Sequence, residues 1–291
     1  MNGEKTTRGI YVLSAEQMPL YEKFKDIATR NSDLIFDQVI EFFEVLYKGT
    51  EIKRAVVGLS GGIDSALTAF FAARYFDPEN VFVAKMPNDE ISSEESIAYA
   101  NLLIEQLGIP DKNVFEIPIG EAADATMKNL EKAGVKLDAV DRGNVMARER
   151  MKNLYAMARV FGGRVLDTCN KTEVLMGYFT VGGDGQSDLN PMGGLFKTWV
   201  WELARIFGLP QEIIDRAPSA ELAVGQTDEK DMGISYLALD LLLYLRYVKN
   251  VSEDSLVDDY FYPREIVNMV VERVRVNRFK SIPTPVLEFD L

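Results

Sequence analysis

The stretch AVVGLSGGIDSALTAFF, residues 55–71, contains residue types that together could bind an anion. A short apolar run turns at Ser60, Gly61 and Gly62 directly into an amphipathic helical pattern. A glycine turn at a helix N-terminus exposes several backbone N–H groups at the positive end of the helix dipole, and glycine lets the backbone approach a ligand closely. The stretch therefore predicts a phosphate site between a buried strand and a helix.

Asp64 and Ser65 follow this turn. A carboxylate at the mouth of the site would repel a bare phosphate but suits a phosphate that carries a divalent cation, and the hydroxyls of Ser60 and Ser65 add donors. The pattern lacks both the Gly-Lys-Ser/Thr ending of a Walker A loop and the three-glycine spacing of a Rossmann fingerprint. An ordinary glycine turn, with Asp64 as a first-turn capping acid, is the alternative interpretation.

The elements that must position this turn alternate between apolar runs and helical patterns. The apolar runs are 55–59, 81–86, 114–119 and 164–168, and the helical patterns include 32–49, 93–108, 144–163, the end of 191–210 and the chain from about residue 232. Such alternation predicts an α/β fold with a parallel sheet flanked by helices on both faces. We expect one domain over 33–291, preceded by residues 1–32 as an extension that is mobile or forms a lid.

The composition limits the classes of function. With 291 residues and 47% hydrophobic content the chain can bury a large core. Its formal charge of −13 and pI near 4.7 argue against partners such as nucleic acid or an anionic membrane, which need a basic face. The absence of histidine excludes His-based triads and His metal sites, and the single cysteine, Cys169, excludes an internal disulfide. The chain begins with neither a signal-peptide core nor a membrane-spanning apolar run, so we expect a cytoplasmic protein.

Four sequence blocks resemble known enzymes. SGGIDS (60–65) is similar to the SGGxDS loop of the ATP pyrophosphatases, which cleave ATP between its α and β phosphates and transfer AMP to an acceptor. The blocks RGNVMARERM, LDTCNKTEVLMGYFTVGGDGQSDLNPMGGLFKTWV and APSAELAVGQTDEKDMGISYLALD extend this, in order, to a resemblance to NAD synthetase over roughly residues 33–285. The resemblance implies the adenine nucleotide alpha-hydrolase-like fold and a C–N ligase. That ligase would amidate deamido-NAD with ammonia through an acyl adenylate, forming NAD and releasing AMP and pyrophosphate.

The resemblance also assigns site residues. ATP would be bound by Gly58, Leu59, Ser60, Gly61, Gly62, Ile63, Asp64, Ser65, Thr168, Lys197 and Ser219; Mg²⁺ by Asp64 and Glu173; and deamido-NAD by Asn144, Arg148, Asp188, Phe279 and Lys280. Asp184 would lie near the reacting centre, where it could hold ammonium or remove its proton, and Lys197 would be the second catalytic residue. Two carboxylates completed by phosphate oxygens and water are normal for Mg²⁺.

Several of these assignments have a structural alternative. Glu173 could be a solvated helix acid, the aspartates of the glycine-rich segment 177–194 could simply form turns, and Arg148 could belong to a salt-bridged surface helix. Phe279 and Val181 stand where the family places a histidine and a lysine, so the dinucleotide-binding mode is less well defined than the ATP site.

The nitrogen donor and the partners complete these expectations. Glutamine-using relatives carry a separate amidase domain with a catalytic cysteine, for which the 291 residues leave no room, so we expect free ammonia or a separate amidotransferase chain. Cys169 is interpreted as a packing residue. The resemblance implies a homodimer, for which the apolar stripe of residues 35–47 is a candidate interface or, equally, core. An ATP pyrophosphatase with another acceptor, and a nucleotide sensor without turnover, are the rival functions.

Overall fold

The computed structural model describes residues 9–88, 93–185, 187–216 and 227–287. Four parallel strands form a sheet in the order β3-β2-β1-β4, with β1 Ala55–Gly58, β2 Val81–Lys85, β3 Val114–Glu116 and β4 Arg164–Val165. In register, Ala55 pairs with both Val81 and Arg164. The strands are shorter than the apolar runs in the sequence, because the runs continue past the carboxyl edge of the sheet, where Leu59 and Met86 line a cavity.

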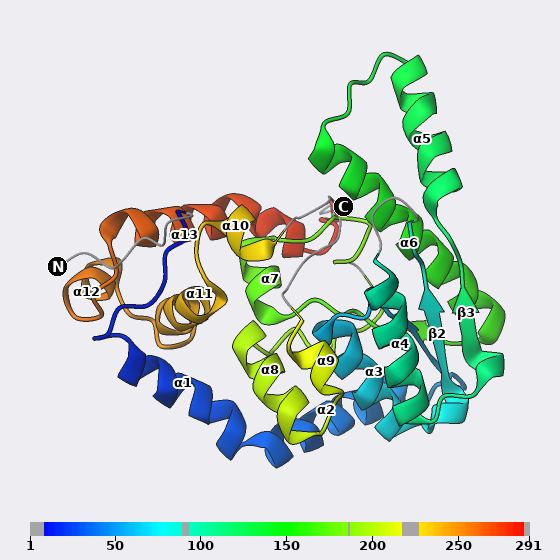
Figure 1. Cartoon of the computed structure of the whole chain (residues 1–291), viewed down its shortest axis with the longest axis horizontal. Helices are drawn as coiled ribbons and strands as arrows, with labels where there is room; N and C mark the ends of the chain where they lie inside the picture. Colours follow the sequence, from blue (N-terminus) through cyan, green and yellow to red (C-terminus); the bar gives the residue numbers. More distant parts are fainter. Residues whose placement is uncertain (1–8, 89–92, 186, 217–226, 288–291) are drawn as a thin grey trace, which may run out of the picture.

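Helices cover both faces of this sheet, as predicted (Figure 1). Alternation along the strands sends Val57 and Val83 into one core and Val56 and Phe82 into the other. The first core contains α2 (Ser32–Tyr47), α3 (Ile63–Phe76), α4 (Glu94–Leu107), α8 (Lys197–Ile206) and α9 (Gln211–Ile214). The second contains α5 (Gly120–Lys132) and α6 (Ala139–Phe161), which starts before the predicted 144 because Asp138 forms a capping box with Asp141.

A third core is mainly helical and lies beside the sheet (Figure 1). It is built on α1 (Met18–Arg30), α7 (Lys171–Met176), α11 (Tyr236–Leu243), α12 (Glu253–Asp258) and α13 (Arg264–Asn277), with α10 (Asp228–Met232) at its edge. Four shorter helical segments complete the description: η1 (Pro78–Asn80), η2 (Asp111–Asn113), the π-helical η3 (Tyr244–Val248) and η4 (Arg278–Ser281). Because α8 contacts both α3 and α11, it joins the helical core to the sheet.

The N-terminal segment, expected as an extension or lid, packs against the helical core in its described part. Tyr11 is 1% exposed and pairs with Ile234, and α1 buries Phe24 against α8. The Trp199 indole N–H donates to the Phe24 carbonyl at 3.1 Å. Sequence analysis missed this packing because only three residues of α1 are buried, which leaves a polar pattern.

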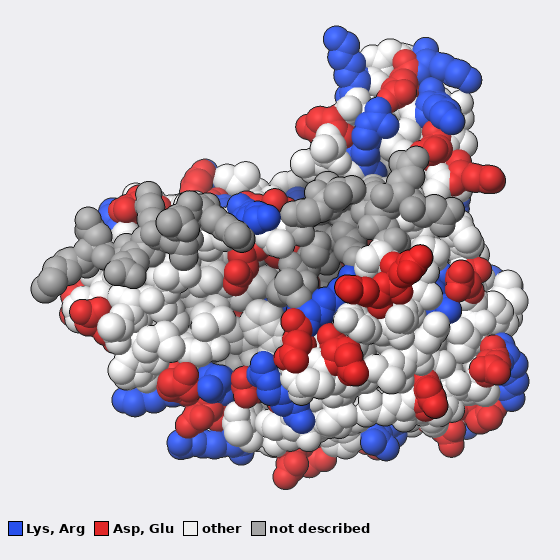
Figure 2. Space-filling view, in the orientation of Figure 1, with Lys and Arg blue, Asp and Glu red and all other residues white. Residues whose placement is uncertain are grey.

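The apolar stripe of α2 serves mainly the first core, where Val39, Phe43 and Tyr47 are buried. None of the helices in the described ranges has the length and apolar character that crossing a bilayer requires. On the face shown in Figure 2, acidic and basic side chains are interspersed over the described surface.

Candidate active site

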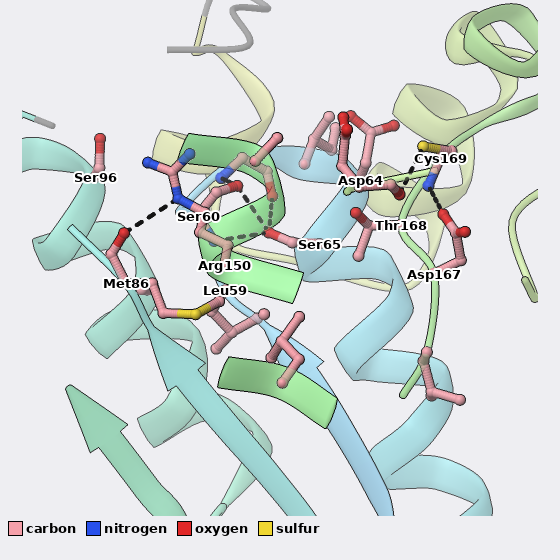
Figure 3. A pocket seen from close by; sticks show the side chains of 18 of the residues that line it. Leu59, Ser60, Asp64, Ser65, Met86, Ser96, Arg150, Asp167, Thr168 and Cys169 are labelled. Atoms are coloured by element: carbon pink, nitrogen blue, oxygen red, sulfur yellow. Dashed lines mark hydrogen bonds between the residues drawn. The ribbon is translucent and has the colours of Figure 1, made fainter. Parts of the chain in front are cut away.

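A cavity of about 260 Å³ opens at the carboxyl edge of the sheet. Ligands of open α/β sheets bind at this edge, beyond the ends of the strands. Ser60, Asp64 and Ser65 line the cavity together with Thr168 and Cys169 from the segment that follows β4, and Figure 3 shows Asp64 next to Thr168 and Cys169.

The glycine turn has the strand–turn–helix geometry that the sequence predicts. Gly62 is the N-cap of α3, and Ile63, Asp64 and Ser65 of the first turn of this helix line the cavity. The Ser65 hydroxyl donates to the Gly62 carbonyl at 2.9 Å, and the Gly62 N–H donates to the Ser60 hydroxyl oxygen at 3.2 Å. Of the eight predicted loop residues 58–65, all but Gly61 line the cavity.

Gly61 has a different role, because it makes the turn possible. Its φ is +73°, and a Cβ there would lie 2.3 Å from the Ser96 carbonyl oxygen on α4. Gly61→Ala is expected to lower the free energy of unfolding by at least about 2 kcal/mol, since an L-residue is strained at this φ and the obstacle is backbone. Urea denaturation measures this loss.

Gly62→Ala is the matched variant for that comparison. Gly62 has a negative φ of −91°, and its nearest obstacle would be the Ser60 hydroxyl at 3.2 Å. We expect a loss of less than about 1 kcal/mol, the ordinary cost of alanine at an N-cap. Equal losses in the two variants would show that neither the positive φ nor the Ser96 contact determines the residue at position 61.

The charged centre of the cavity joins three elements. Lys197, the first residue of α8 and only 3% exposed, forms an ion pair with Asp64 of α3. The Asn170 amide donates to the other Asp64 oxygen at 3.0 Å. Asn170 also caps α7: its side chain accepts the Glu173 N–H at 3.0 Å, while its own N–H donates to the Glu173 carboxylate at 3.1 Å. Asn170 thus holds both predicted metal ligands.

The electrostatics of this centre depend on one buried cation. Burial and the charge of Asp64 raise the pKa of Glu173 well above its usual value. Burial alone would lower the pKa of Lys197, but Asp64 and Glu173 outweigh it and raise that pKa. A third carboxylate, Asp228, has its pKa raised by burial and held back by Lys197. Lys197 therefore stays protonated and compensates mutually repelling carboxylates.

The segment after β4 and the glycine-rich loop close one side of the cavity. Asp184 lines the cavity, is exposed at its surface and accepts the Thr180 N–H at 2.8 Å; desolvation by the surrounding protein raises its pKa. Burial raises the pKa of Asp167 to about 6, although this carboxylate accepts bonds from the Cys169 N–H and the Ser187 hydroxyl. The Cys169 thiol is buried and its pKa is raised well above the usual range. A protonated, enclosed thiol agrees with a packing role.

The residues predicted for the dinucleotide do not line this cavity. Asn144 accepts the Thr180 hydroxyl at 2.7 Å, and the Arg148 guanidinium donates to the Val181 carbonyl at 3.1 Å. The Lys280 ammonium donates to the carbonyls of Gly177 and Phe179 at 2.8 and 3.1 Å. All three side chains therefore attach other elements to the glycine-rich loop.

The two other predicted dinucleotide residues are also outside the cavity. Asp188 accepts the Val165 N–H at 2.8 Å, and Phe279 is 65% exposed. Ser219, predicted to contact ATP, lies outside the described residues.

Sequence reasoning missed several residues that line the cavity. Arg150 lies two positions beyond Arg148 and donates to the Met86 carbonyl at 3.2 Å (Figure 3). Arg216 reaches the Ser96 hydroxyl at 2.7 Å. Asp228 accepts a hydrogen bond from the Tyr236 hydroxyl at 2.9 Å. It lies within the block APSAELAVGQTDEKDMGISYLALD, so this acid could have been predicted as a site residue from the family resemblance.

A parallel sheet with a glycine turn at its carboxyl edge, next to a carboxylate pair and a buried lysine, defines a nucleotide-binding α/β enzyme. The family model of NAD synthase matches residues 35–284, so the chain belongs to the NAD synthase family, as the sequence blocks predict. Curated relatives agree. The chain is 40% identical over 250 residues to the NH(3)-dependent NAD(+) synthetase of Trichlorobacter lovleyi, covering 86% of this chain and 88% of that protein. It is 38% identical to that of Methanosarcina acetivorans, covering 87% and 96%.

Solved structures confirm the fold. An NMN synthetase from Francisella tularensis aligns with a TM-score of 0.75 at 29% identity, covering 88% of this chain and 98% of that one. An NH3-dependent NAD synthetase from Campylobacter jejuni aligns with a TM-score of 0.72 at 28% identity and the same coverage.

Proposed function

We propose that this protein uses ATP to amidate deamido-NAD with ammonia, forming NAD, AMP and pyrophosphate. The observation that carries the proposal is the charged centre of Asp64, Lys197 and Glu173 beside the glycine turn. It supports phosphate chemistry in a family whose relatives are named NH(3)-dependent NAD(+) synthetases.

In the first step, a carboxylate oxygen of the dinucleotide attacks the α-phosphorus of ATP, and the bond to the β-phosphate breaks. Both reactants are anions, so their repulsion is the main obstacle. The N–H groups at the start of α3 and the Lys197 ammonium would hold the phosphates and neutralise the departing pyrophosphate. This step needs no general base, which suits a protein without histidine.

The residues at this centre also fit Mg²⁺. Asp64 and Glu173 both face the cavity, and the Asp64 charge raises the pKa of Glu173, so a cation between them would relieve a real repulsion. No group of three or more metal-binding side chains occurs in the described part of the chain, so phosphate and water oxygens would have to complete the coordination of the ion. When bound, Mg²⁺ supplies positive charge to the phosphates.

In the second step, ammonia attacks the carbonyl carbon of the acyl adenylate, AMP leaves, and a proton must be removed from the nitrogen. Asp184 is the proposed acceptor, because it faces the cavity and its raised pKa strengthens it as a base. Closure of residues 177–194 over the adenylate would keep out water.

Product analysis tests this function. Purified protein is incubated with ATP, Mg²⁺, deamido-NAD and either ammonium or glutamine. NAD with matching AMP and pyrophosphate from ammonium alone is the expected result. AMP without NAD would keep the ATP site but reopen the acceptor, and absence of ATP cleavage would favour a nucleotide sensor.

A mononucleotide acceptor in place of the dinucleotide is the alternative substrate, and it is tested in the same assay. The aligned Francisella tularensis structure is named an NMN synthetase, and Val181 and Phe279 replace the lysine and histidine that the family resemblance implies at the dinucleotide site. Nicotinic acid mononucleotide, whose amidation would yield NMN, is therefore the alternative acceptor. A higher kcat/KM for it than for deamido-NAD would overturn the proposed substrate.

Arg148→Ala is expected to raise the KM for deamido-NAD by about tenfold, the value of one charge-assisted contact, and to change the KM for ATP less. Arg148 is exposed on α6 and donates to the loop at Val181, outside the phosphate centre, which suits a role in binding the acceptor. Steady-state kinetics with each substrate varied in turn measures both constants. Arg159→Ala, also exposed on α6, is the matched control; equal effects on the two KM values would remove Arg148 from the acceptor site.

We further propose a cytoplasmic homodimer that binds neither nucleic acid nor membrane. The formal charge of −13 supports the last two points. Leu34 and Val45 of α2, 54% and 63% exposed, are available to a second copy. Sedimentation equilibrium tests the dimer, and a monomer at micromolar concentration would contradict it.

A further inference from the structure

Directly behind the charged centre lies an ionisable side chain that the proposed chemistry leaves unused. Asp240 of α11 is 0% exposed and accepts three hydrogen bonds. The Thr172 hydroxyl donates to one carboxylate oxygen at 2.6 Å. The backbone N–H and the hydroxyl of Thr198 both donate to the other oxygen at 2.8 Å.

These three bonds reach the two elements that carry the charged centre. Thr172 precedes Glu173 on the first turn of α7, and Thr198 follows Lys197 on the first turn of α8. The Thr172 hydroxyl also accepts the Lys197 N–H at 3.1 Å, which links the two helix starts directly. One carboxylate therefore ties together the backbones from which Glu173 and Lys197 project.

If position 240 had a purely structural role, an apolar residue could fill it at a lower cost in free energy. Burying a carboxylate costs free energy unless hydrogen bonds compensate it, and well-packed apolar groups often replace buried charges without loss. Burial raises the pKa of Asp240 to about 6, although the bonds from Thr172 and Thr198 oppose the rise. What a carboxylate adds is two acceptor atoms in fixed directions, and here these face α7 and α8.

We propose that Asp240 is a positioning residue that sets the separation of the Glu173 carboxylate and the Lys197 ammonium through Thr172 and Thr198. The inference deepens the proposed function and rests on it, since in that function Glu173 holds the metal and Lys197 binds the ATP phosphates. Asp240 itself touches no reactant.

Asp240→Asn and Thr172→Val test this role. Asn keeps the shape of Asp but replaces one acceptor by an N–H donor, which would compete with the Lys197 N–H for the Thr172 hydroxyl oxygen. Val at position 172 keeps the branched shape and removes the hydroxyl. Each variant is expected to lower kcat about tenfold to a hundredfold, the usual effect of losing a supporting contact behind a site, with the KM for deamido-NAD unchanged. Thr172→Ser, which retains the hydroxyl, is expected to restore kcat.

Tyr262→Phe is the matched structural control. The Tyr262 hydroxyl donates to the Ala238 carbonyl at 2.9 Å, so this variant removes one buried hydrogen bond from α11 without touching α7 or α8. It is expected to lose stability in urea while kcat stays at the wild-type value. If the Asp240 and Thr172 variants only lose stability in the same way, or if Ser at 172 behaves as Val does, the positioning role is overturned.

A binding measurement separates this inference from the proposed function. Calorimetric titration with a non-hydrolysable ATP analogue and Mg²⁺ needs no acceptor and no turnover. Weaker binding to Thr172→Val than to Thr172→Ser is expected. Should the wild type make no NAD, the proposed function fails, but this comparison still decides the role of Asp240. Equal binding by the two Thr172 variants counts against that role, and the Thr172 pair carries the test if Asp240→Asn does not fold.

Discussion

Glu173→Gln is expected to abolish pyrophosphate release, by at least about a thousandfold in kcat, while the protein remains as stable as the wild type or becomes more stable. The activity falls because one of the two carboxylates proposed to hold the metal becomes neutral. The fold survives because a glutamine oxygen can still accept the Asn170 N–H that Glu173 accepts at 3.1 Å. Stability can even rise, since the substitution removes a buried charge whose pKa is raised by burial and by Asp64.

Asp64→Asn is expected to abolish pyrophosphate release to the same extent, but with a loss of stability. Asp64 forms the ion pair with Lys197, and an asparagine leaves that buried ammonium with one fewer countercharge. Release of pyrophosphate and urea denaturation, measured on the same preparations, separate the two variants.

Glu94→Gln supplies the control for the simpler interpretation of Asp64. Glu94 is an exposed first-turn acid of α4, which is all that Asp64 would be if the turn bound no nucleotide. A first-turn acid contributes about 0.3–1 kcal/mol to stability and nothing to catalysis. Full activity in Glu173→Gln or Asp64→Asn would refute the metal assignment.

The parts of the site that sequence analysis predicted are local. The turn at Gly61 needs a positive φ, and the amides of the following helix belong to neighbouring residues, so one short stretch contains the whole phosphate loop. The alternation of apolar runs and helical patterns along the chain likewise predicts the parallel sheet and the helices on its two faces. These features depend on spacing along the chain.

The parts that sequence analysis missed depend on tertiary packing. Asp240 and Thr172 are separated by 68 positions, and nothing in the spacing indicates that they meet at 2.6 Å. Sequence analysis indicates Arg148, but of these two α6 arginines it is Arg150 that lines the cavity. The polar pattern of α1 hides the burial of Phe24, because a helix that covers a core with few residues has a weak apolar stripe.

The removal of the buried cation should have the broadest effect on this protein. Lys197→Met keeps an unbranched, nearly isosteric side chain, one atom shorter, but leaves Asp64, Glu173 and Asp228 without the ammonium that compensates them. Breaking a buried ion pair from one side costs about 3–5 kcal/mol, and we expect a loss of this size in the free energy of unfolding at neutral pH. We also expect kcat to fall about a thousandfold, because the charge on the phosphates loses its fixed partner.

The pH dependence of this loss identifies its cause. Without Lys197, the pKa values of Glu173 and Asp228, which burial already raises, must rise further in the folded variant. The folded variant then binds more protons than its unfolded chain, so its stability relative to the wild type increases as the pH falls from neutral towards about 5. Lys171→Met is the matched control, because Lys171 opens α7 as Lys197 opens α8 but lies over the Phe196 ring, and burial lowers its pKa. A stability deficit in Lys197→Met that does not change with pH, or an equal deficit in Lys171→Met, would mean that carboxylate repulsion is not what Lys197 relieves.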